Sequence, residues 1–247
     1  MNHCILGLLL LFISSLTLAE PSLFLVGDED NKPECYINAE GESVGIDVDI
    51  IREVARRLGL NVSIQLAPWV RVLAMVKSGK ADGGFPLFMT AERREYALYS
   101  KEPVHVSVMT AYTKSGEEFP YRSLNDLHGK RVGINRGYSI SKEFDRVAQE
   151  GLINIVEVET IAQLVKMLLD GRIEAIAATP SSVEAYLKQE NIELSAIGHV
   201  RARAAYLTLS KKSAIDNKQQ LLDDINRTMV TMKEDGTIDS IRKKYVD

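Results

Sequence analysis

The sequence predicts an α/β protein with mainly parallel sheets, arranged as two lobes. Stretches typical of strands alternate with stretches typical of helices, as they do in layered α/β folds. An internal echo relates the two halves: VKSGKADGGFP at 76–86 and LLDGRIEAIAATP at 168–180 share the order helix, glycine, basic residue, acid, short strand, proline. The 247 residues suit one large domain or two modest ones. We therefore expect two lobes of matching topology.

The N-terminus predicts a secretory signal peptide, residues 1–19, that is cleaved before Glu20. It contains no Lys, Arg, Asp or Glu, and an apolar run from Ile5 to Ile13 precedes small residues at the expected cleavage site. An uncleaved membrane anchor is the competing interpretation. A pair of serines interrupts the roughly 20 apolar residues that a spanning helix would need. We therefore expect a free protein in the periplasm.

Local signals place the elements of the first half. A helix with apolar residues at helical spacing runs from an N-cap at Asp47 to a stop at Gly59. A second helix begins near Trp69 and ends at Gly79, and Thr90 caps a third. The expected strands lie at 23–26, 61–65 and 81–86.

The second half repeats this order. A capping box, Thr160-x-x-Gln163, opens an apolar helix, because each side chain can bond a free backbone amide of the other residue. Gly171 follows that helix, and a glycine there can adopt the left-handed conformation that ends a helix. The other expected elements are strands at 131–135 and 153–158, a helix at 141–148, a helix at 215–234 and a short helix after Thr237.

Composition excludes several classes of function. The 30 Lys and Arg residues against 34 Asp and Glu give a net charge of −4, which does not favour a nucleic-acid partner. The chain has 4 His and 2 Cys, and it contains no C-x-x-C, H-E-x-x-H or P-loop string. We therefore expect neither a metal site nor a cofactor. The mature chain keeps Cys35 alone, so no intramolecular disulfide can form.

Four stretches, in this order and spacing, carry a resemblance to a known family. They are VGIDVDIIREVARRLGL at 44–60, APWVRVLAMVKSGKADGGFP at 67–86, TAERREYALYSKEP at 90–103 and DLHGKRVGINRGYS at 126–139. With them, the chain resembles the family 3 periplasmic solute-binding proteins, the polar amino-acid type of receptors that serve ABC transporters. The resemblance covers nearly all of the chain after Glu20.

This resemblance implies a type II periplasmic-binding-protein fold, in which two α/β lobes are joined by two crossover strands and close on a ligand. Lobe 1 would comprise 20–108 and 206–247, and lobe 2 would comprise 109–205. The crossovers would lie at 105–113 and 201–209. The resemblance further implies a monomer that is not an enzyme and that hands its solute to an ABC permease in the inner membrane.

The resemblance also implies a site. Arg93 matches the family arginine that grips a ligand carboxylate, and Ser139 matches a hydroxyl residue that completes the carboxylate site. In open α/β sheets, ligands bind beyond the carboxyl ends of the strands, which places the segments 85–90, 135–139 and 178–181 around one cleft. Trp69 and Arg71 are further ligand-binding candidates. Trp69 could instead pack in the core, and Arg71 could instead be a charge exposed to solvent. The other ligand-binding candidates are Thr90, Phe88, Tyr138, Thr179 and Phe85.

Departures from the family pattern bear on the ligand. Thr179 stands where these receptors usually place the acid that meets an α-ammonium, and Asn31 stands where an aromatic ring is common. The α-ammonium of an ordinary amino acid would then need a negatively charged partner among the acids at 28–30. We expect a small carboxylated or amino-acid-like solute. The alternatives are a cyclohexadienyl dehydratase-like enzyme, with Glu184 or the acids at 28–30 as general acid, and a soluble ligand sensor for a membrane receptor.

Overall fold

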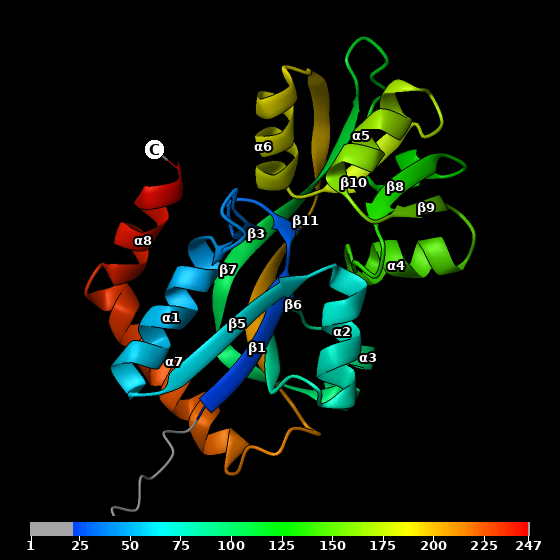
Figure 1. The fold of residues 1–247 in the computed structure, drawn as a ribbon. Helices are drawn as coiled ribbons and strands as arrows, with labels where there is room; N and C mark the ends of the chain where they lie inside the picture. The colour runs from blue at the N-terminus through cyan, green and yellow to red at the C-terminus, as the bar shows by residue number, and fades with distance from the viewer. Residues whose placement is uncertain (1–21, 247) are drawn as a thin grey trace, which may run out of the picture.

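The computed structural model describes residues 22–246, so the predicted signal peptide lies outside the described residues. Two α/β lobes lie one above the other in Figure 1. We call β1–β6 with α1–α3, α7 and α8 the first lobe, and β8–β10 with α4–α6 the second lobe. The helices are α1 Ile46–Leu58, α2 Trp69–Ser78, α3 Ala91–Tyr96, α4 Lys142–Gln149, α5 Ile161–Leu169, α6 Pro180–Glu190, α7 Lys218–Glu234 and α8 Thr237–Val246, with a short 3₁₀ helix at Leu124–Leu127.

An 8-stranded sheet runs through both lobes in the order β5-β1-β6-β11-β7-β10-β8-β9. The strands β5, β1 and β6 are parallel in the first lobe, and β10, β8 and β9 are parallel in the second. A 3-stranded sheet, β2-β3-β4, adds to the first lobe. The strands are β1 Ser22–Asp28, β2 Asp30–Asn31, β3 Cys35–Ile37, β4 Ser43–Val44, β5 Asn61–Ala67, β6 Gly83–Phe88, β7 Ala97–Lys114, β8 Arg131–Asn135, β9 Asn154–Val158, β10 Ala175–Ala178 and β11 Leu194–Ser210.

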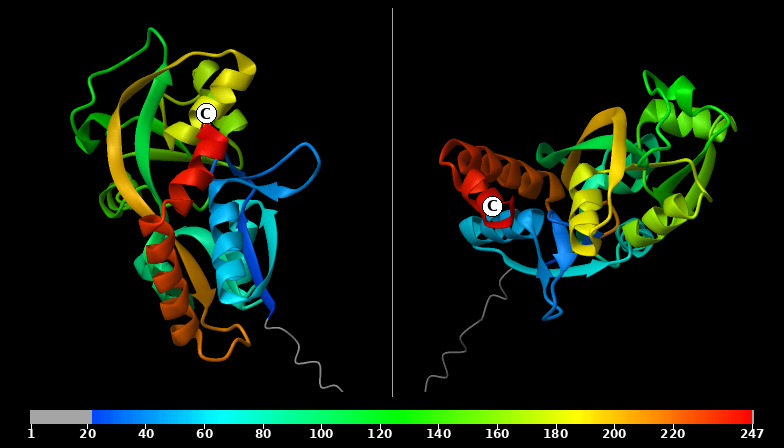
Figure 2. Two further views of the ribbon diagram at one scale, coloured as in Figure 1. Left: turned by 90° about the vertical axis from the view of Figure 1, so that its left-hand side faces the viewer. Right: turned by 90° about the horizontal axis from the view of Figure 1, so that it is seen from above.

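Two long strands connect the lobes. Strand β7 has 18 residues and β11 has 17, and the two pair antiparallel along their length. Figure 2 shows them passing from one lobe to the other. The predicted crossovers at 105–113 and 201–209 lie within these strands. The exact lobe boundaries, after residues 108 and 205, fall inside the same strands and stay a prediction.

Each lobe has an apolar core of its own. Leu25, Ile50 and Met229 are fully buried in the first lobe, where α1 and α7 cover one face of the sheet. Phe144 of α4 and Leu164 of α5 are buried in the second lobe. Because each core contains residues from several elements, each lobe can move as a unit about β7 and β11.

The start of α1 corrects one prediction. Asp47 is not the N-cap, because α1 begins at Ile46 after Gly45. The first amides of the helix, those of Ile46 and Asp47, donate instead to the backbone carbonyls of Pro33 and Glu34 at 3.0 and 2.8 Å. The Asp47 side chain therefore does not cap the helix. It lies in the interior, with no exposed surface.

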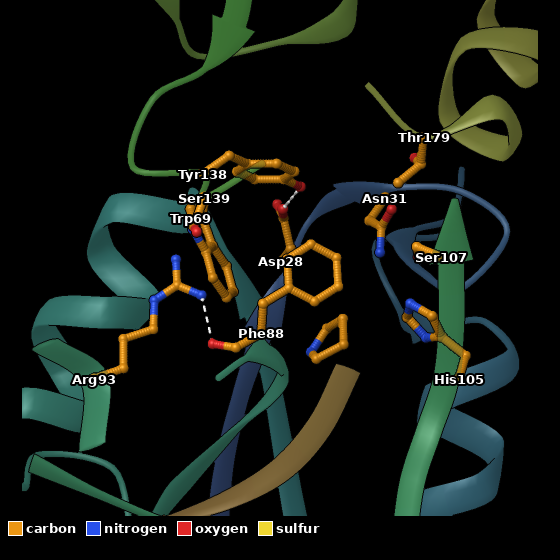
Figure 3. A pocket seen from close by; sticks show the side chains of 11 residues that line it. Asp28, Asn31, Trp69, Phe88, Arg93, His105, Ser107, Tyr138, Ser139 and Thr179 are labelled. Carbon is orange, nitrogen blue, oxygen red and sulfur yellow. Dashed lines mark hydrogen bonds between the residues drawn. The ribbon is translucent and has the colours of Figure 1, made fainter. Parts of the chain in front are cut away.

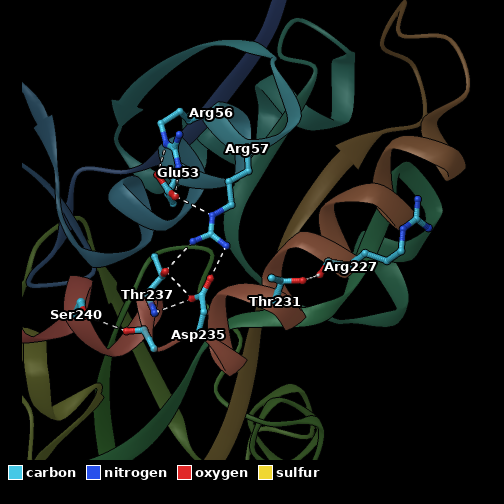
Figure 4. A network of polar contacts seen from close by, with 9 residues as sticks. Glu53, Arg56, Arg57, Arg227, Thr231, Asp235, Thr237 and Ser240 are labelled. Atoms are coloured by element: carbon cyan, nitrogen blue, oxygen red, sulfur yellow. Dashed lines mark hydrogen bonds and ion pairs between the residues drawn. The ribbon is translucent and has the colours of Figure 1, made fainter.

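The C-terminal helix is tied to α1 by a polar network, shown in Figure 4. Arg57 donates to Glu53 on its own helix at 2.8 Å, and to Asp235 at the end of α7 and Thr237 at the start of α8, both at 2.7 Å. Further along α8, Tyr245 donates to Asp49 at 3.0 Å. These bonds hold α8 against the end of the first lobe. Within residues 22–246, no helix has both the length and the apolar character needed to cross a membrane.

Candidate ligand-binding site

A cavity with about 370 Å³ of empty space lies between the lobes, beyond the carboxyl ends of β1, β6, β8 and β10. This is the edge where an open α/β sheet is expected to bind its ligand. Because the residues that line the cavity come from both lobes, a solute can enter when the lobes move apart. The cavity is lined by Asp28, Asn31, Trp69, Pro86, Phe88, Arg93, His105, Ser107, Tyr138, Ser139 and Thr179 (Figure 3).

The structure brings together six of the nine predicted ligand-binding residues. Phe85, Thr90 and Arg71 do not line the cavity. Phe85 is fully buried in the core of the first lobe, and Arg71 is exposed on the surface. Thr90 caps α3 as predicted, and its hydroxyl accepts a bond from the Arg93 amide at 3.1 Å. The six that line the cavity are Arg93, Ser139, Phe88, Trp69, Tyr138 and Thr179.

Arg93 is buried, with 4% of its surface exposed. Its Nη1 donates to the carbonyl of Phe88 and its Nη2 to the carbonyl of Gly137, each at 3.0 Å. The guanidinium also lies over the ring of Trp69, 5.3 Å from the centroid. Burial lowers the pKa of Arg93, but a guanidinium stays charged in proteins. Among the described residues, no carboxylate forms an ion pair with it.

Asp28 supplies a negative group to the same cavity. It ends β1, has 4% of its surface exposed, and accepts bonds from the Tyr138 hydroxyl and from the Asp30 amide at 3.2 Å. Burial raises the pKa of Asp28 to about 6, although both bonds oppose the shift. Burial, together with the charge of Asp28, also raises the pKa of Tyr138 above its usual value. Asp28 thus places an acid at the end of β1 in the cavity, whereas the residue at position 179 is a threonine.

Ser139 has its hydroxyl engaged within the protein. The hydroxyl donates to Asp145 at 2.5 Å and accepts from Arg203 at 2.7 Å. The same guanidinium donates to the Met89 carbonyl of the first lobe at 3.1 Å and lies 4.7 Å from the Phe88 ring centroid. Arg203, which no sequence motif singles out, therefore holds Ser139 and Phe88 in place at the edge of the cavity.

A second chain of polar side chains joins the lobes at the other side of the cavity. Thr179 donates to Ser182 at 2.8 Å, and Ser182 donates to Asn31 at 2.9 Å. All three side chains are buried. Hydroxyl and amide groups in such a position can also bond a polar solute when it enters.

The crossover strand β7 contributes residues that the sequence analysis missed. His105 and Ser107 both line the cavity. They are two positions apart, so they lie on one face of the strand. The stretch VHVSV offered a signal, because two polar residues alternate there with valines at the start of a predicted crossover strand. Within residues 22–246, no three His, Cys, Asp or Glu side chains converge as metal ligands would.

Comparison with known proteins agrees with this architecture. The family model of the bacterial extracellular solute-binding proteins, family 3, matches residues 23–247. The L-cystine-binding protein TcyJ of Escherichia coli K12 is 24% identical over 227 residues, which cover 92% of this chain and 83% of that protein.

Solved structures share the fold. An ancestral arginine-binding protein bound to arginine superposes with a TM-score of 0.78 at 24% identity, covering 92% of this chain and 99% of that one. A histidine kinase sensor domain with similarity to periplasmic binding proteins gives a TM-score of 0.80 at 18% identity, covering 92% and 96%. With its two-lobed fold, its cavity between the lobes and a family match over residues 23–247, the chain belongs to the bacterial extracellular solute-binding proteins of family 3, and its role is to bind a solute.

Proposed function

We propose that the protein captures a small amino-acid-like zwitterion in the periplasm and hands it, as a monomer, to an ABC permease of the inner membrane. One observation carries the proposal: a guanidinium and a carboxylate, those of Arg93 and Asp28, are buried on the wall of one cavity. Neither forms an ion pair with another residue of the described chain. Buried charges are costly unless a partner of opposite sign meets them.

A zwitterion would meet both charges at once. Its carboxylate would take a charge-assisted bond from Arg93, and its ammonium would donate to Asp28. The approach of an ammonium lowers the pKa of a neighbouring carboxyl. Asp28, whose pKa burial raises to about 6, would therefore be fully ionised in the complex. The position of Asp28 removes the objection that Thr179 raises against an amino acid.

The remaining wall suits the rest of such a solute. Phe88, Trp69 and Tyr138 provide apolar surface, and small-molecule sites combine apolar walls with a few convergent polar groups. The ligands named for two similar proteins also belong to the class of amino acids. The E. coli relative is an L-cystine-binding protein, and the ancestral protein is bound to arginine. Both ligands have an α-carboxylate and an α-ammonium in common.

We infer that binding takes place without turnover. Glu184, one general acid considered for an enzyme, is exposed on α6 and does not line the cavity. Asp28 is held by the Tyr138 hydroxyl. Incubation with a prephenate-like cyclic acid should leave that acid intact. Consumption of it by the wild type, but not by Asp28→Asn, would establish an enzyme instead.

A thermal-shift screen of the mature chain tests the binding proposal. A solute that binds the folded state must raise the melting temperature by mass action. We expect shifts from α-amino acids, and smaller or no shifts from carboxylic acids without an amine and from amines without a carboxylate. Shifts confined to simple carboxylic acids, or to amines, would contradict the proposal.

A further inference from the structure

A buried acid–base pair borders the cavity at the end remote from Arg93. In Figure 3, Arg93 lies on one side, His105 and Ser107 lie on the other, and Asp28 and Phe88 lie between them. His105 Nδ1 is 2.8 and 3.0 Å from the two carboxylate oxygens of Asp47. His105 has 8% of its surface exposed, and Asp47 has none.

The fold fixes this pair from several sides. Asp47 comes from the first turn of α1, and His105 comes from β7. Glu34, which precedes β3, adds a second acid, and Ser181 of the second lobe donates to it at 3.2 Å. Arg242 on α8 is a positive charge that acts on His105.

These charges favour a protonated imidazole. Burial alone would lower the pKa of His105, and Arg242 acts in the same direction. The carboxylates of Asp47 and Glu34 outweigh both effects, and the pKa of His105 is raised above its usual value. Ser107, Asn31 and Thr179, the other polar groups on this side of the cavity, do not titrate in this range.

The geometry leaves one ring nitrogen for a solute. Since Nδ1 is bonded to Asp47, the proton on that nitrogen is fixed, as in other carboxylate–histidine pairs. Nε2 makes no hydrogen bond to any residue in 22–246. It is a donor when the ring is protonated and an acceptor when the ring is neutral. His105 can therefore bond either kind of polar group on a solute.

We propose that His105, oriented by Asp47, determines the specificity of the cavity for the part of the solute remote from Arg93, where it selects a short side chain that ends in a carboxylate or an amide. The assignment rests on the proposed function, since it takes the amino-acid head group to be held by Arg93 and Asp28. His105 is a binding residue in this scheme, and Asp47 is a positioning residue.

A pH dependence follows from the two forms of the ring. The protonated ring donates to a carboxylate, and this bond is lost as the pH rises through the pKa of His105. An amide keeps a bond in both forms, because its N–H can donate to the neutral Nε2. The affinity for an acid-ended solute relative to its amide should therefore fall with rising pH. The titration of Asp28 affects both affinities equally, because both solutes share one head group, so it cancels in the ratio of the two affinities.

The test is calorimetric titration at about pH 5 and pH 8 with two matched series: L-aspartate, L-asparagine and L-2-aminobutyrate, and L-glutamate, L-glutamine and L-norvaline. For the wild type we expect the polar members of at least one series to bind about 10-fold or more tightly than the apolar member. We also expect the acid-to-amide ratio to fall several-fold between the two pH values. L-Arginine is the competing probe, because Asp47 and Glu34 could attract a cation.

Variants separate the role of each residue. His105→Leu should abolish the preference for polar side chains, so that the polar and apolar members of each series bind with affinities within about three-fold of one another. His105→Gln should keep the preference for the amide and lose the pH dependence. Asp47→Asn should move the pH midpoint of the ratio downward, which a purely structural role would not do. Melting without ligand verifies that each variant folds.

The possible failures are distinguishable. Binding of the apolar member as tightly as the polar ones, an unchanged preference in His105→Leu, or tighter binding of L-arginine would overturn the role of His105 and leave the capture of amino acids standing. Binding of no amino acid at all would overturn the proposed function, and this inference with it.

Discussion

Arg93 and Asp28 are charged groups that the fold buries without giving them ionic partners. Arg93 bonds two backbone carbonyls, one from each lobe, and Asp28 bonds a hydroxyl of the second lobe. Such groups reduce stability or leave it unchanged, because neutral partners repay little of the cost of desolvating a charge. Their burial at one cavity is explained if a solute completes both pairs.

Replacement of Arg93 tests the carboxylate half of the site. Arg93→Ala should cost roughly 2 to 5 kcal/mol of binding free energy, an affinity loss of about 30-fold or more, because it removes a desolvated charge-assisted bond. Arg93→Lys should also weaken binding, since an ammonium cannot reproduce the planar fork. Calorimetric titration with an amino acid from the screen measures both effects.

The adjacent arginine is the control for this change. Arg94 is exposed and bonds Met89 at 2.6 Å, outside the cavity. Arg94→Ala should leave affinity unchanged within about two-fold. Equal affinities for wild type and Arg93→Ala, in protein that melts normally without ligand, would remove Arg93 from the site.

Asp28 makes a prediction about stability and pH. Its pKa is about 6 in the folded chain against 3.8 when unperturbed, so the folded state holds the proton more tightly than the unfolded state. Its contribution to stability is therefore fully present below about pH 4 and is lost as the pH rises through about 6, by roughly 3 kcal/mol at most. Asp28→Asn should remove this loss.

Urea denaturation measures the effect. The wild type should be the less stable of the two proteins at neutral pH, and the difference should shrink toward pH 4. If the difference in unfolding free energy between Asp28→Asn and the wild type is the same at neutral pH as at pH 4, Asp28 carries no such desolvation cost.

At the scale of elements, the helix ends that depend on contacts between neighbouring residues could be predicted from the sequence. Thr90, Ser141 and Thr160 each accept a bond from an amide three residues on, and the capping box at Thr160 is complete. These contacts lie within one helical turn, so the sequence pattern contains all the information. Gly79 and Gly171 follow their helices with positive φ, as predicted.

Long-range contacts explain what was missed. Asp47 looked like a cap, but two loop carbonyls replace that cap and a strand 58 positions along the chain provides His105 as its partner. Phe85 looked like a lining residue, but the alternation of β6 turns it into the core while Phe88 reaches the cavity. Which side of a strand faces a cavity depends on neighbours that the local pattern does not specify.

The entry to α1 gives a prediction at this scale. Gly45 has φ 129°, and a Cβ there would lie 2.4 Å from the Glu34 carbonyl oxygen, which also accepts the Asp47 amide. Gly45→Ala should therefore cost about 3 kcal/mol or more of unfolding free energy. Gly41→Ala, with a positive φ but open space around the new methyl group, should cost about 1 to 2 kcal/mol. Equal losses in denaturant titrations would show that the contact with Glu34 does not matter.

For the whole molecule, the cavity exists because two lobes meet. The Trp69 indole donates to the Gly137 carbonyl at 3.2 Å, and the Ile161 amide donates to Asp30 at 3.1 Å. Each bond joins a residue of the first lobe to a residue of the second. Since β7 and β11 are the long strands that link the lobes, opening and closing should bend these two strands.

Closure can be followed in solution. Binding should reduce the radius of gyration in small-angle scattering, because the lobes draw together around the solute. Trp69 is the only tryptophan of the chain and lies at the junction, so its emission should change in parallel. Identical scattering profiles with and without a saturating amino acid would contradict a hinge mechanism.

The central claim is that one solute satisfies both buried charges, and a calorimetric cycle tests it most directly. An amino acid and its analogue without the amine are each titrated into the wild type and into Asp28→Asn. We predict that the amine strengthens binding strongly in the wild type and little in the variant, with a coupling free energy of about 1.5 kcal/mol or more between the ammonium and Asp28. A coupling free energy near zero, with the amine equally favourable in both proteins, would contradict the account.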